Sequence, residues 1–224
     1  MKDSWLIIRK EWTGFAKSDR GVFLVYGVLV LAWSVLLSSN IETLLAGAGY
    51  LWLIFFSVIV SGNFSNTTFS AERISGSLEI LLTSGVSRTA ILLGKIAFVI
   101  AMSIVLGFIC YVLAVGIYLF KGEKIDLILN IIPAGRMMIL YSTACFMNGA
   151  CGAWLAVRVN NPRLLHFVNL FVLVLIVAVH AFLSTFFSLS IWSLFVALAF
   201  MGGLFMLLAV RDFKSDRVLQ PVVY

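Results

Sequence analysis

Residues 63–95 read NFSNTTFSAERISGSLEILLTSGVSRTAILLGK, and this polar stretch separates two long apolar runs. It contains an amphipathic pattern, two glutamates, a turn signal and a basic end. The sequence around it is hydrophobic enough to lie in a membrane. We therefore predict that residues 63–95, called the elbow segment below, are a structured connection that contacts something outside the bilayer.

The composition is typical of a polytopic membrane protein. Of the 224 residues, 62% are hydrophobic and 12% are charged, whereas about 25% are charged in typical soluble domains. The mean hydropathy is +1.09. A chain of this length is expected to form a single all-α membrane domain over residues 1–224, and this composition leaves no surface for a soluble enzyme core.

Six apolar runs are candidate membrane spans, because a helix needs about 20 apolar residues to cross about 30 Å of hydrocarbon. The run at 125–134 is too short to cross, and we expect Pro133 to end it as an interfacial or re-entrant piece. The six predicted spans cover residues 22–38, 44–62, 97–120, 137–157, 167–187 and 191–210.

The distribution of Lys and Arg predicts the orientation. With the N-terminus inside the cell, thirteen of these residues lie in cytoplasmic segments and three, Lys121, Lys124 and Arg136, lie outside. Because basic residues are enriched in cytoplasmic loops, we expect both termini and the elbow segment on the cytoplasmic side of the cell (plasma or inner) membrane. The net charge of +6 follows from the same bias and does not indicate a nucleic-acid partner.

Residues 3–18 form a second amphipathic element. Trp5, Trp12 and Phe15 share one arc of a helical wheel, and Lys10 lies away from that arc. Tryptophan at the membrane boundary with basic residues in water predicts a helix lying flat on the inner surface of the lipid bilayer.

The elbow segment is predicted to form a helix–turn–helix structure. A helix over residues 72–84 would have one apolar face and one acidic face that points to the cytoplasm. Gly76 inside it costs about 1 kcal/mol relative to Ala, which suggests close approach by another backbone or a bend. Gly85 is expected to end this helix and Ser87 to cap the next one, which continues into the third span. Exposed carboxylates on the acidic face suit a basic groove on a partner protein. The apolar face holds Ile74, Leu78, Leu81 and Leu82, and the acidic face holds Glu72, Gly76, Glu79 and Thr83.

The string ERISGSLEILLTS at 72–84, followed by SR at 87–88 and GK at 94–95, resembles the loop after the second span in ABC exporter permeases of the type-2 class. The family pattern is Glu, three residues, Gly-Ser/Thr-Leu-Glu, a Leu pair, Ser/Thr-Pro and a downstream Lys. This chain has Gly85 where the family usually has Pro. It also joins its last two predicted spans almost directly, so the outer re-entrant helices of the family are reduced or absent.

The resemblance implies a transmembrane permease subunit of an ABC exporter. Such a subunit pairs with a second copy of itself, or with a related permease, above two cytoplasmic ATP-binding subunits. In that family the loop is the coupling helix, which lies in a groove of the ATPase and transmits its closure to the spans. Carried over by position, the coupling role falls on Glu72, Gly76, Leu78, Glu79, Leu82 and Arg88.

The sequence offers no chemistry of its own. It has no GxxxxGK[ST] motif, so we expect ATP to be bound by the partner subunit and this chain to be neither an enzyme nor a cofactor-binding protein. His166 and His180 are 14 residues apart without acidic neighbours, which argues against a metal site. We interpret His180 as a hydrogen-bonded packing residue and Asn148 as a helix–helix contact.

Two other interpretations stay open. A haem-handling permease of cytochrome c maturation has a similar length and a similar Gly-x-Leu-Glu loop, although a set of haem-ligand histidines is not evident here. A membrane scaffold or assembly factor without transport is a different class. A secondary transporter is disfavoured because no carboxylate lies at the middle of a predicted span. Co-purification of an ATPase would separate the permeases from the scaffold.

Overall fold

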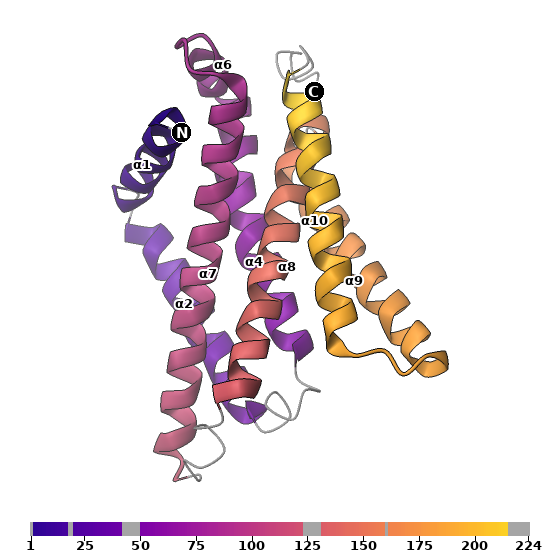
Figure 1. Ribbon diagram of the computed structural model, residues 1–224. Coiled ribbons are helices and arrows are strands. Elements are labelled where there is room, and N and C mark those ends of the chain that lie inside the picture. The colour runs from indigo at the N-terminus through magenta and orange to yellow at the C-terminus, as the bar shows by residue number, and fades with distance from the viewer. Residues whose placement is uncertain (1, 18–19, 42–49, 123–130, 160, 215–224) are drawn as a thin grey trace.

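The computed structural model describes residues 2–17, 20–41, 50–122, 131–159 and 161–214. Within these ranges the chain is all-helical and contains no strand, which confirms the all-α part of the prediction. The long helices form a bundle, and α1 lies beside one end of it (Figure 1). The helices outside the elbow segment are α1 (Lys2–Ala16), α2 (Arg20–Ser39), α4 (Tyr50–Ser65), α7 (Arg88–Phe120), α8 (Ile131–Arg158), α9 (Pro162–Phe186) and α10 (Ile191–Lys214).

Four helices of the described part are long and apolar enough to cross a membrane: α2, α7, α9 from Leu164 and α10 to Phe213. This supports a membrane protein. The predicted spans 44–62 and 137–157 correspond to α4 and α8, which are not among these four. The described part of α4 has 16 residues, and its predicted first turns at 44–49 lie outside the described residues.

The centre of the bundle is α8, which packs against α4 and α10, while α2 packs along α7. The approach of α8 to α4 is close, since a Cβ added at Gly152 would lie 2.5 Å from the Ser65 hydroxyl. Small residues at such contacts let membrane helices approach each other. Because α8 faces protein along much of its length, it needs fewer lipid-compatible side chains, which explains its lower hydrophobicity.

Buried polar contacts also join the central helices. Asn148 donates to the Ser57 hydroxyl of α4 at 2.8 Å, and Asn169 of α9 donates to the Asn148 carbonyl at 3.3 Å. The Tyr141 hydroxyl donates to the Ser103 carbonyl of α7 at 2.7 Å. The interpretation of Asn148 as a helix–helix contact is therefore confirmed.

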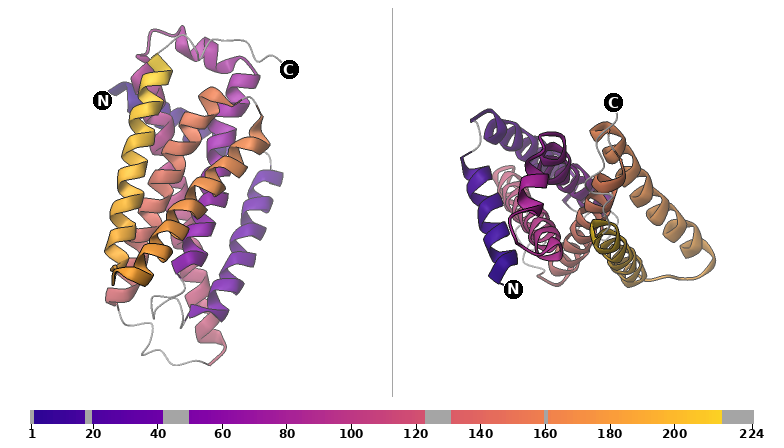
Figure 2. Two further views of the ribbon diagram at one scale, coloured as in Figure 1. Left: turned by 90° about the vertical axis from the view of Figure 1, so that its right-hand side faces the viewer. Right: turned by 90° about the horizontal axis from the view of Figure 1, so that it is seen from above.

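Helix α9 is the least enclosed of the long helices. Only 11% of its apolar window is buried within the chain, against 39% for α7. Both the front view and the view from above show α9 leaning away from α10 (Figures 1 and 2). Most of its surface must therefore be covered by lipid or by another protein.

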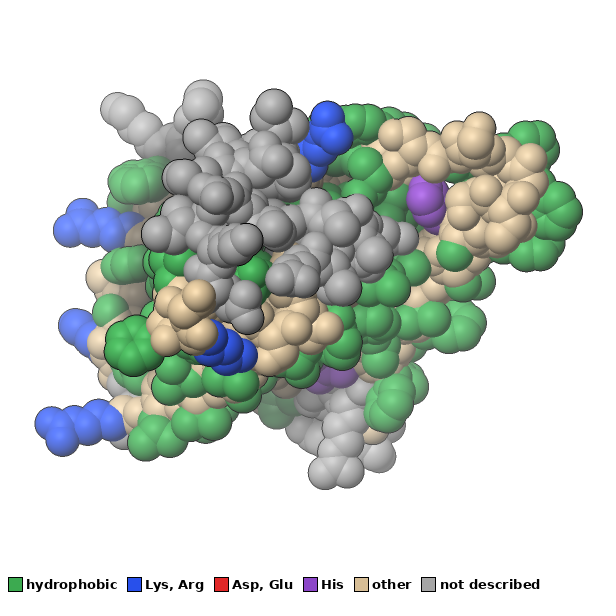
Figure 3. Space-filling model, turned by 90° about the horizontal axis from the view of Figure 1, so that it is seen from below, with side chains coloured by type: hydrophobic (Ala, Val, Ile, Leu, Met, Phe, Trp, Pro, Cys, Tyr) green, Lys and Arg blue, Asp and Glu red, His purple; other side chains and the backbone are tan. Residues whose placement is uncertain are grey.

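One end of the bundle carries the elbow segment, the start of α1 and the end of α10, and we call it the elbow end (Figure 1). Viewed from the opposite end, the described side chains are mostly hydrophobic and the charged ones in view are Lys and Arg (Figure 3). The prediction that Pro133 ends a separate piece is wrong, because α8 runs through it from Ile131. Proline is tolerated there since the first turn of a helix needs no N–H partner. Residues 125–130 of that prediction lie outside the described residues.

Candidate functional site

The elbow segment consists of three short helical pieces between α4 and α7. These are a π-helical turn η1 (Asn66–Ser70), α5 (Ala71–Ile74) and α6 (Ser77–Leu82). Gly76 separates α5 from α6 with a φ of 74°, a left-handed conformation that only glycine adopts readily. The prediction of one helix over 72–84 is therefore wrong, because the chain turns at Gly76 instead of continuing.

The predicted end of the elbow segment is confirmed in part. Gly85 lies in the turn after α6 with a φ of 79°, but α6 ends earlier than predicted, at Leu82, with Thr83 as its C-cap. The Ser87 hydroxyl accepts a hydrogen bond from the Ala90 backbone N–H at 3.3 Å, so Ser87 caps α7. These two signals are local, and neither depends on the rest of the fold.

The break at Gly76 places the two glutamates of the elbow segment on different sides. Glu79 is exposed on α6, as predicted. Glu72 instead points inward, and its side chain is only 18% exposed. The prediction that both carboxylates share an outward acidic face is wrong for Glu72.

Glu72 belongs to a buried ion cluster built around Lys95 of α7, whose side chain is fully buried. The Lys95 ammonium donates to Glu72 Oε2 at 2.6 Å, to Glu11 Oε1 at 2.7 Å and to the Thr68 carbonyl at 2.9 Å. Lys10 donates to Glu72 Oε1 at 2.8 Å. An ammonium group has three N–H donors, so Lys95 is fully satisfied. The cluster joins α1, η1, α5 and α7.

The charges of the cluster change the pKa values of Glu72 and Lys10. Burial alone would raise the pKa of the Glu72 carboxyl, but the Lys95 and Lys10 ammonium groups outweigh burial and hold that pKa below its usual value. Burial lowers the pKa of Lys10, while its bond to Glu72 and its closeness to Glu11 raise it, and the net change is a rise. Near neutral pH Glu72 and Lys10 therefore stay charged and paired.

Arg73, the neighbour of Glu72, points to the opposite side of the elbow segment. Its Nη1 donates to the carbonyls of Ala156 and Val157, each at 3.0 Å. These carbonyls belong to the last turn of α8, where a helix leaves its acceptors unpaired. Two consecutive residues thus fasten the elbow segment to two different parts of the bundle, α7 with α1 through Glu72 and α8 through Arg73.

A further polar contact continues from α8 to α10. Arg158 Nε donates to Asp212 Oδ2 at 2.6 Å, and the Trp154 indole N–H donates to the same oxygen at 3.0 Å. The Arg158 guanidinium also lies 4.9 Å from the Trp154 ring centroid. A continuous set of polar contacts therefore crosses the elbow end from α1 to α10.

The outward side of the elbow segment is partly apolar. Ile80 is 74% exposed beside the exposed Glu79 of α6, and Ile74 of α5 is exposed as well. Ile80 was not among the predicted site residues, although as an isoleucine on the acidic half of the helical pattern it is conspicuous. Of the six predicted residues, Glu72 points inward, Gly76 forms the turn, Leu78 is buried, Glu79 is exposed, and Leu82 and Arg88 are half-buried.

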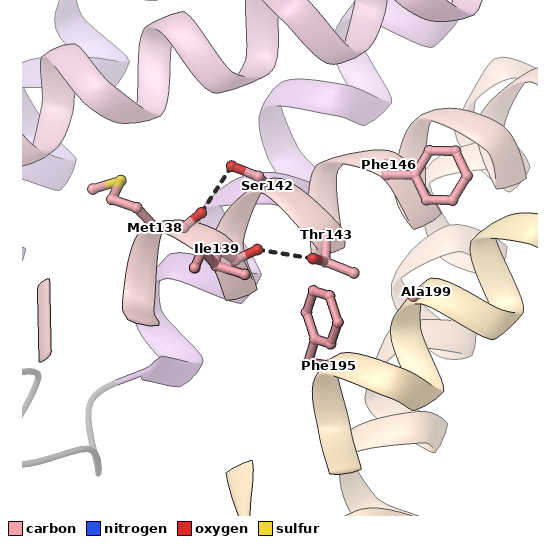
Figure 4. Close-up of a pocket in the computed structure, with 7 residues that line it drawn as sticks. All are labelled: Met138, Ile139, Ser142, Thr143, Phe146, Phe195 and Ala199. Atoms are coloured by element: carbon pink, nitrogen blue, oxygen red, sulfur yellow. Dashed lines mark hydrogen bonds between the residues drawn. The ribbon is translucent and has the colours of Figure 1, made fainter. Parts of the chain in front are cut away.

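Elsewhere the described residues offer little chemistry. They contain no group of three or more His, Cys, Asp or Glu that could hold a metal ion. A hollow of about 450 Å³ between α8 and α10 is lined mostly by apolar side chains (Figure 4). Its two hydroxyls, those of Ser142 and Thr143, donate to carbonyls of their own helix at 2.8 Å. The elbow segment is therefore the best candidate for a functional site.

No protein-family model matches this chain, and no curated protein matches it. The likeness of the elbow segment to the coupling loop of ABC permeases therefore stays a hypothesis that rests on its motif. What can be argued further comes from the contacts of the elbow segment itself.

Proposed function

We propose that this chain is the transmembrane permease subunit of an ABC exporter, in which α6 docks on a separate cytoplasmic ATP-binding subunit. The observation that carries the proposal is the outward surface of α6, where Ile80 is 74% exposed beside Glu79. Exposed apolar patches mark contacts with another protein or with a membrane, and Ile74 of α5 adds to the exposed apolar surface of the elbow segment. In this proposal Glu79 adds charge complementarity to a basic groove.

The contacts behind α6 suit the transmission of force. A push on α6 would reach α5 through the Gly76 turn, and α5 is fastened by Glu72 to Lys95 and by Arg73 to α8. Helix α7 has 33 residues, which is about 50 Å at 1.5 Å per residue. A displacement at the elbow end would therefore tilt a helix that runs the height of the bundle.

The remaining parts of the proposal follow from the sequence. In it α4 and α8 complete six spans, α1 lies on the inner surface, and both termini are cytoplasmic because the basic residues concentrate on that side. A second copy or a related permease completes the pathway, and substrate leaves outward. Energy comes from the partner subunit, since the sequence has no Walker-type ATP site.

The test is purification of the tagged full-length chain from its native membranes in mild detergent. Co-purifying proteins are identified by mass spectrometry, and those with a Walker A motif are assayed for ATP hydrolysis. We expect an ATP-hydrolysing subunit to co-purify with the wild type and with Ile80→Val, which keeps the apolar surface. Ile80→Asp should lower its recovery about tenfold, as expected of an interface hot spot.

Two outcomes would contradict the proposal. One is that no ATP-hydrolysing protein is enriched with the wild-type chain, which would favour a scaffold or assembly factor. The other is that Ile80→Asp and a Glu72→Lys/Glu79→Lys double variant both keep full co-purification and full transport. Monodisperse elution of each variant confirms that it is folded.

A further inference from the structure

Helices α9 and α10 enclose an apolar pocket of about 440 Å³ beside their connection, at the end of the bundle away from the elbow segment. The two helices diverge around it, as Figures 1 and 2 show. Both belong to the segments that are apolar enough to cross a membrane, so with these helices in a bilayer the side of the pocket would face lipid. Its lining consists of Leu175, Ile176, Val179, His180 and Leu183 of α9, with Leu189, Ser193, Ala197, Phe200 and Met201.

The only strongly polar group in this lining is a pair formed by His180 and Ser193. His180 Nε2 lies 2.8 Å from Ser193 Oγ, and the Ser193 hydroxyl donates to the Ser190 carbonyl at 2.6 Å. A hydroxyl has a single proton, so Ser193 must accept the hydrogen bond from His180. The proton of the imidazole is therefore on Nε2. The interpretation of His180 as a hydrogen-bonded residue is confirmed, but only for one of its two ring nitrogens.

The second ring nitrogen, Nδ1, has no hydrogen-bond donor among the described residues. No carboxylate lines the pocket, so no anion there pairs with the ring. In a neutral imidazole with its proton on Nε2, Nδ1 carries a lone pair. In that form of the ring, the pocket combines a large apolar surface with one unsatisfied acceptor.

This combination defines the chemistry of a complementary ligand. A phosphate or carboxylate headgroup offers acceptors and negative charge, which the lone pair of Nδ1 would repel. A pure hydrocarbon would fill the space but leave Nδ1 unpaired, and a buried unpaired acceptor is costly. A hydroxyl group at the end of an apolar body satisfies both requirements.

We propose that the α9–α10 pocket binds a neutral lipid alcohol. Its hydroxyl donates to His180 Nδ1, and its hydrocarbon lies against Val179 and Leu183 of α9 and Phe200 of α10. Val179 is 49% exposed and Phe200 is 70% exposed within the chain, so both have contact surface available. The site is independent of the proposed ATPase partner, because α6 and the ion cluster lie at the other end of the bundle.

The probe is hexadecan-1-ol with a mid-chain diazirine and a terminal alkyne, compared with its O-methyl ether, which keeps the chain but loses the donor. The full-length protein in phosphatidylcholine nanodiscs is irradiated with each probe, and labelled peptides are mapped by mass spectrometry. We expect labels within 175–183 and 193–201, with the alcohol favoured over the ether by about fivefold, the factor that one neutral hydrogen bond supplies.

Three variants test the assignment. His180→Phe keeps a ring but removes the acceptor, so the alcohol and the ether should label it equally. Ala197→Trp fills the pocket and should abolish labelling there. Ala178→Trp makes the same change on α9 at an exposed residue outside the pocket lining, and it should label like the wild type.

The proposal is overturned if the wild type is labelled equally by alcohol and ether, or if the labels lie outside the two peptides. It is also overturned if the alcohol stays favoured about fivefold in His180→Phe. Should Ala197→Trp fail to elute as a monodisperse species, the comparison of probes on the wild type and on His180→Phe still decides the question. None of these measurements needs an ATP-binding subunit.

Discussion

The ion cluster at Lys95 and the pocket at His180 lie at opposite ends of the bundle. Each holds a polar group in apolar surroundings, but the two groups differ in how many hydrogen-bond partners they have. Every donor of the Lys95 ammonium has a partner within 2.9 Å, and these partners come from α1, η1 and α5. His180 has one partner, on the neighbouring helix, and its second nitrogen has none among the described residues. The fully paired Lys95 joins several elements, whereas the half-paired His180 keeps the acceptor that our proposal assigns to a lipid alcohol.

The burial of the two regions follows the same division. The apolar window of α7 is 39% buried and that of α9 is 11% buried. A helix with few contacts inside its own chain has low local stability, so its displacement costs little free energy. The elbow end is thus rigid enough to transmit a displacement to the long helices. The end formed by α9 and α10 can instead change its shape.

The largest effect should come from Lys95→Met, which would remove the buried cation that holds the elbow end together. The variant keeps the length of the side chain but leaves Glu11 and Glu72 close together without that cation. Loss of one partner from a buried ion pair costs about 3–5 kcal/mol, or a fall in melting temperature of about 6–20 °C. The three free, buried cysteines, Cys110, Cys145 and Cys151, allow unfolding to be followed with a thiol-reactive dye.

The control for Lys95→Met is Lys17→Met, which removes a charge from the exposed end of the N-terminal segment and should leave the melting temperature unchanged. Equal melting temperatures for Lys95→Met and the wild type would show that the cluster does not hold the elbow end together. A partial recovery in Lys95→Met/Glu72→Gln would sharpen the assignment, since that variant also removes the unpaired carboxylate.

A smaller effect is expected from pH, because protonation of Glu72 neutralises one carboxylate and leaves Lys95 paired with Glu11. The pKa of Glu72 in the folded protein lies below its usual value, so unfolding takes up a proton in the window between the two values. The stabilisation is fully present above the usual glutamate pKa and is lost as the pH falls through the folded-state pKa. Melting curves from pH 7 to pH 3 should show a steeper acid loss in the wild type than in Glu72→Gln.

The Glu72→Gln comparison isolates one carboxylate from the general acid sensitivity of the chain. The amide introduced by this substitution cannot titrate, so the difference between the two curves reports the Glu72 carboxyl alone. Parallel curves would mean that this carboxyl titrates alike in the folded and unfolded chain, and the ion cluster would then be weaker than its distances indicate.

The smallest effect should come from Gly76→Ala. The left-handed φ of 74° at this turn costs a residue with a Cβ about 1 kcal/mol, equal to a fall of about 2–4 °C in melting temperature. Gly116→Ala is the matched control, because Gly116 lies within α7 and an added Cβ there meets nothing within 4 Å. It should be neutral or slightly stabilising, since alanine favours helix. Equal effects of the two substitutions would contradict the turn at Gly76.

Local signals were sufficient for part of the fold. The helical class follows from composition, and the turn at Gly85 and the cap at Ser87 follow from residues within three positions of each other. A bend was one of two explanations for Gly76, and local signals could not decide between them, because glycine is compatible with both a helix interior and a left-handed turn. The turn is accompanied by a long-range contact, the ion pair between Glu72 and Lys95, which lie 23 residues apart in the sequence.

For the candidate site, the sequence predicted only the residues that are exposed on the outward side of the elbow segment. Glu79 is exposed as its place in the helical pattern indicates, whereas Glu11 lies 84 residues from Lys95 and no periodicity connects them. A single lysine in an apolar helix was a usable signal, because such a charge needs a carboxylate partner, but the sequence does not say which one. The predicted spans at α4 and α8 stay predictions, because the described part of α4 has only 16 residues and α8 is less apolar than the four candidate helices.

The order of residues around Lys95 has a consequence for biosynthesis. Glu11, Thr68 and Glu72, the three partners of its ammonium group, all precede it in the chain. When a ribosome makes this protein, the lysine emerges after every group that will neutralise or accept from it. All partners of the Lys95 ammonium group have therefore been synthesised before Lys95 itself. The third apolar run can enter the membrane with these partners already available.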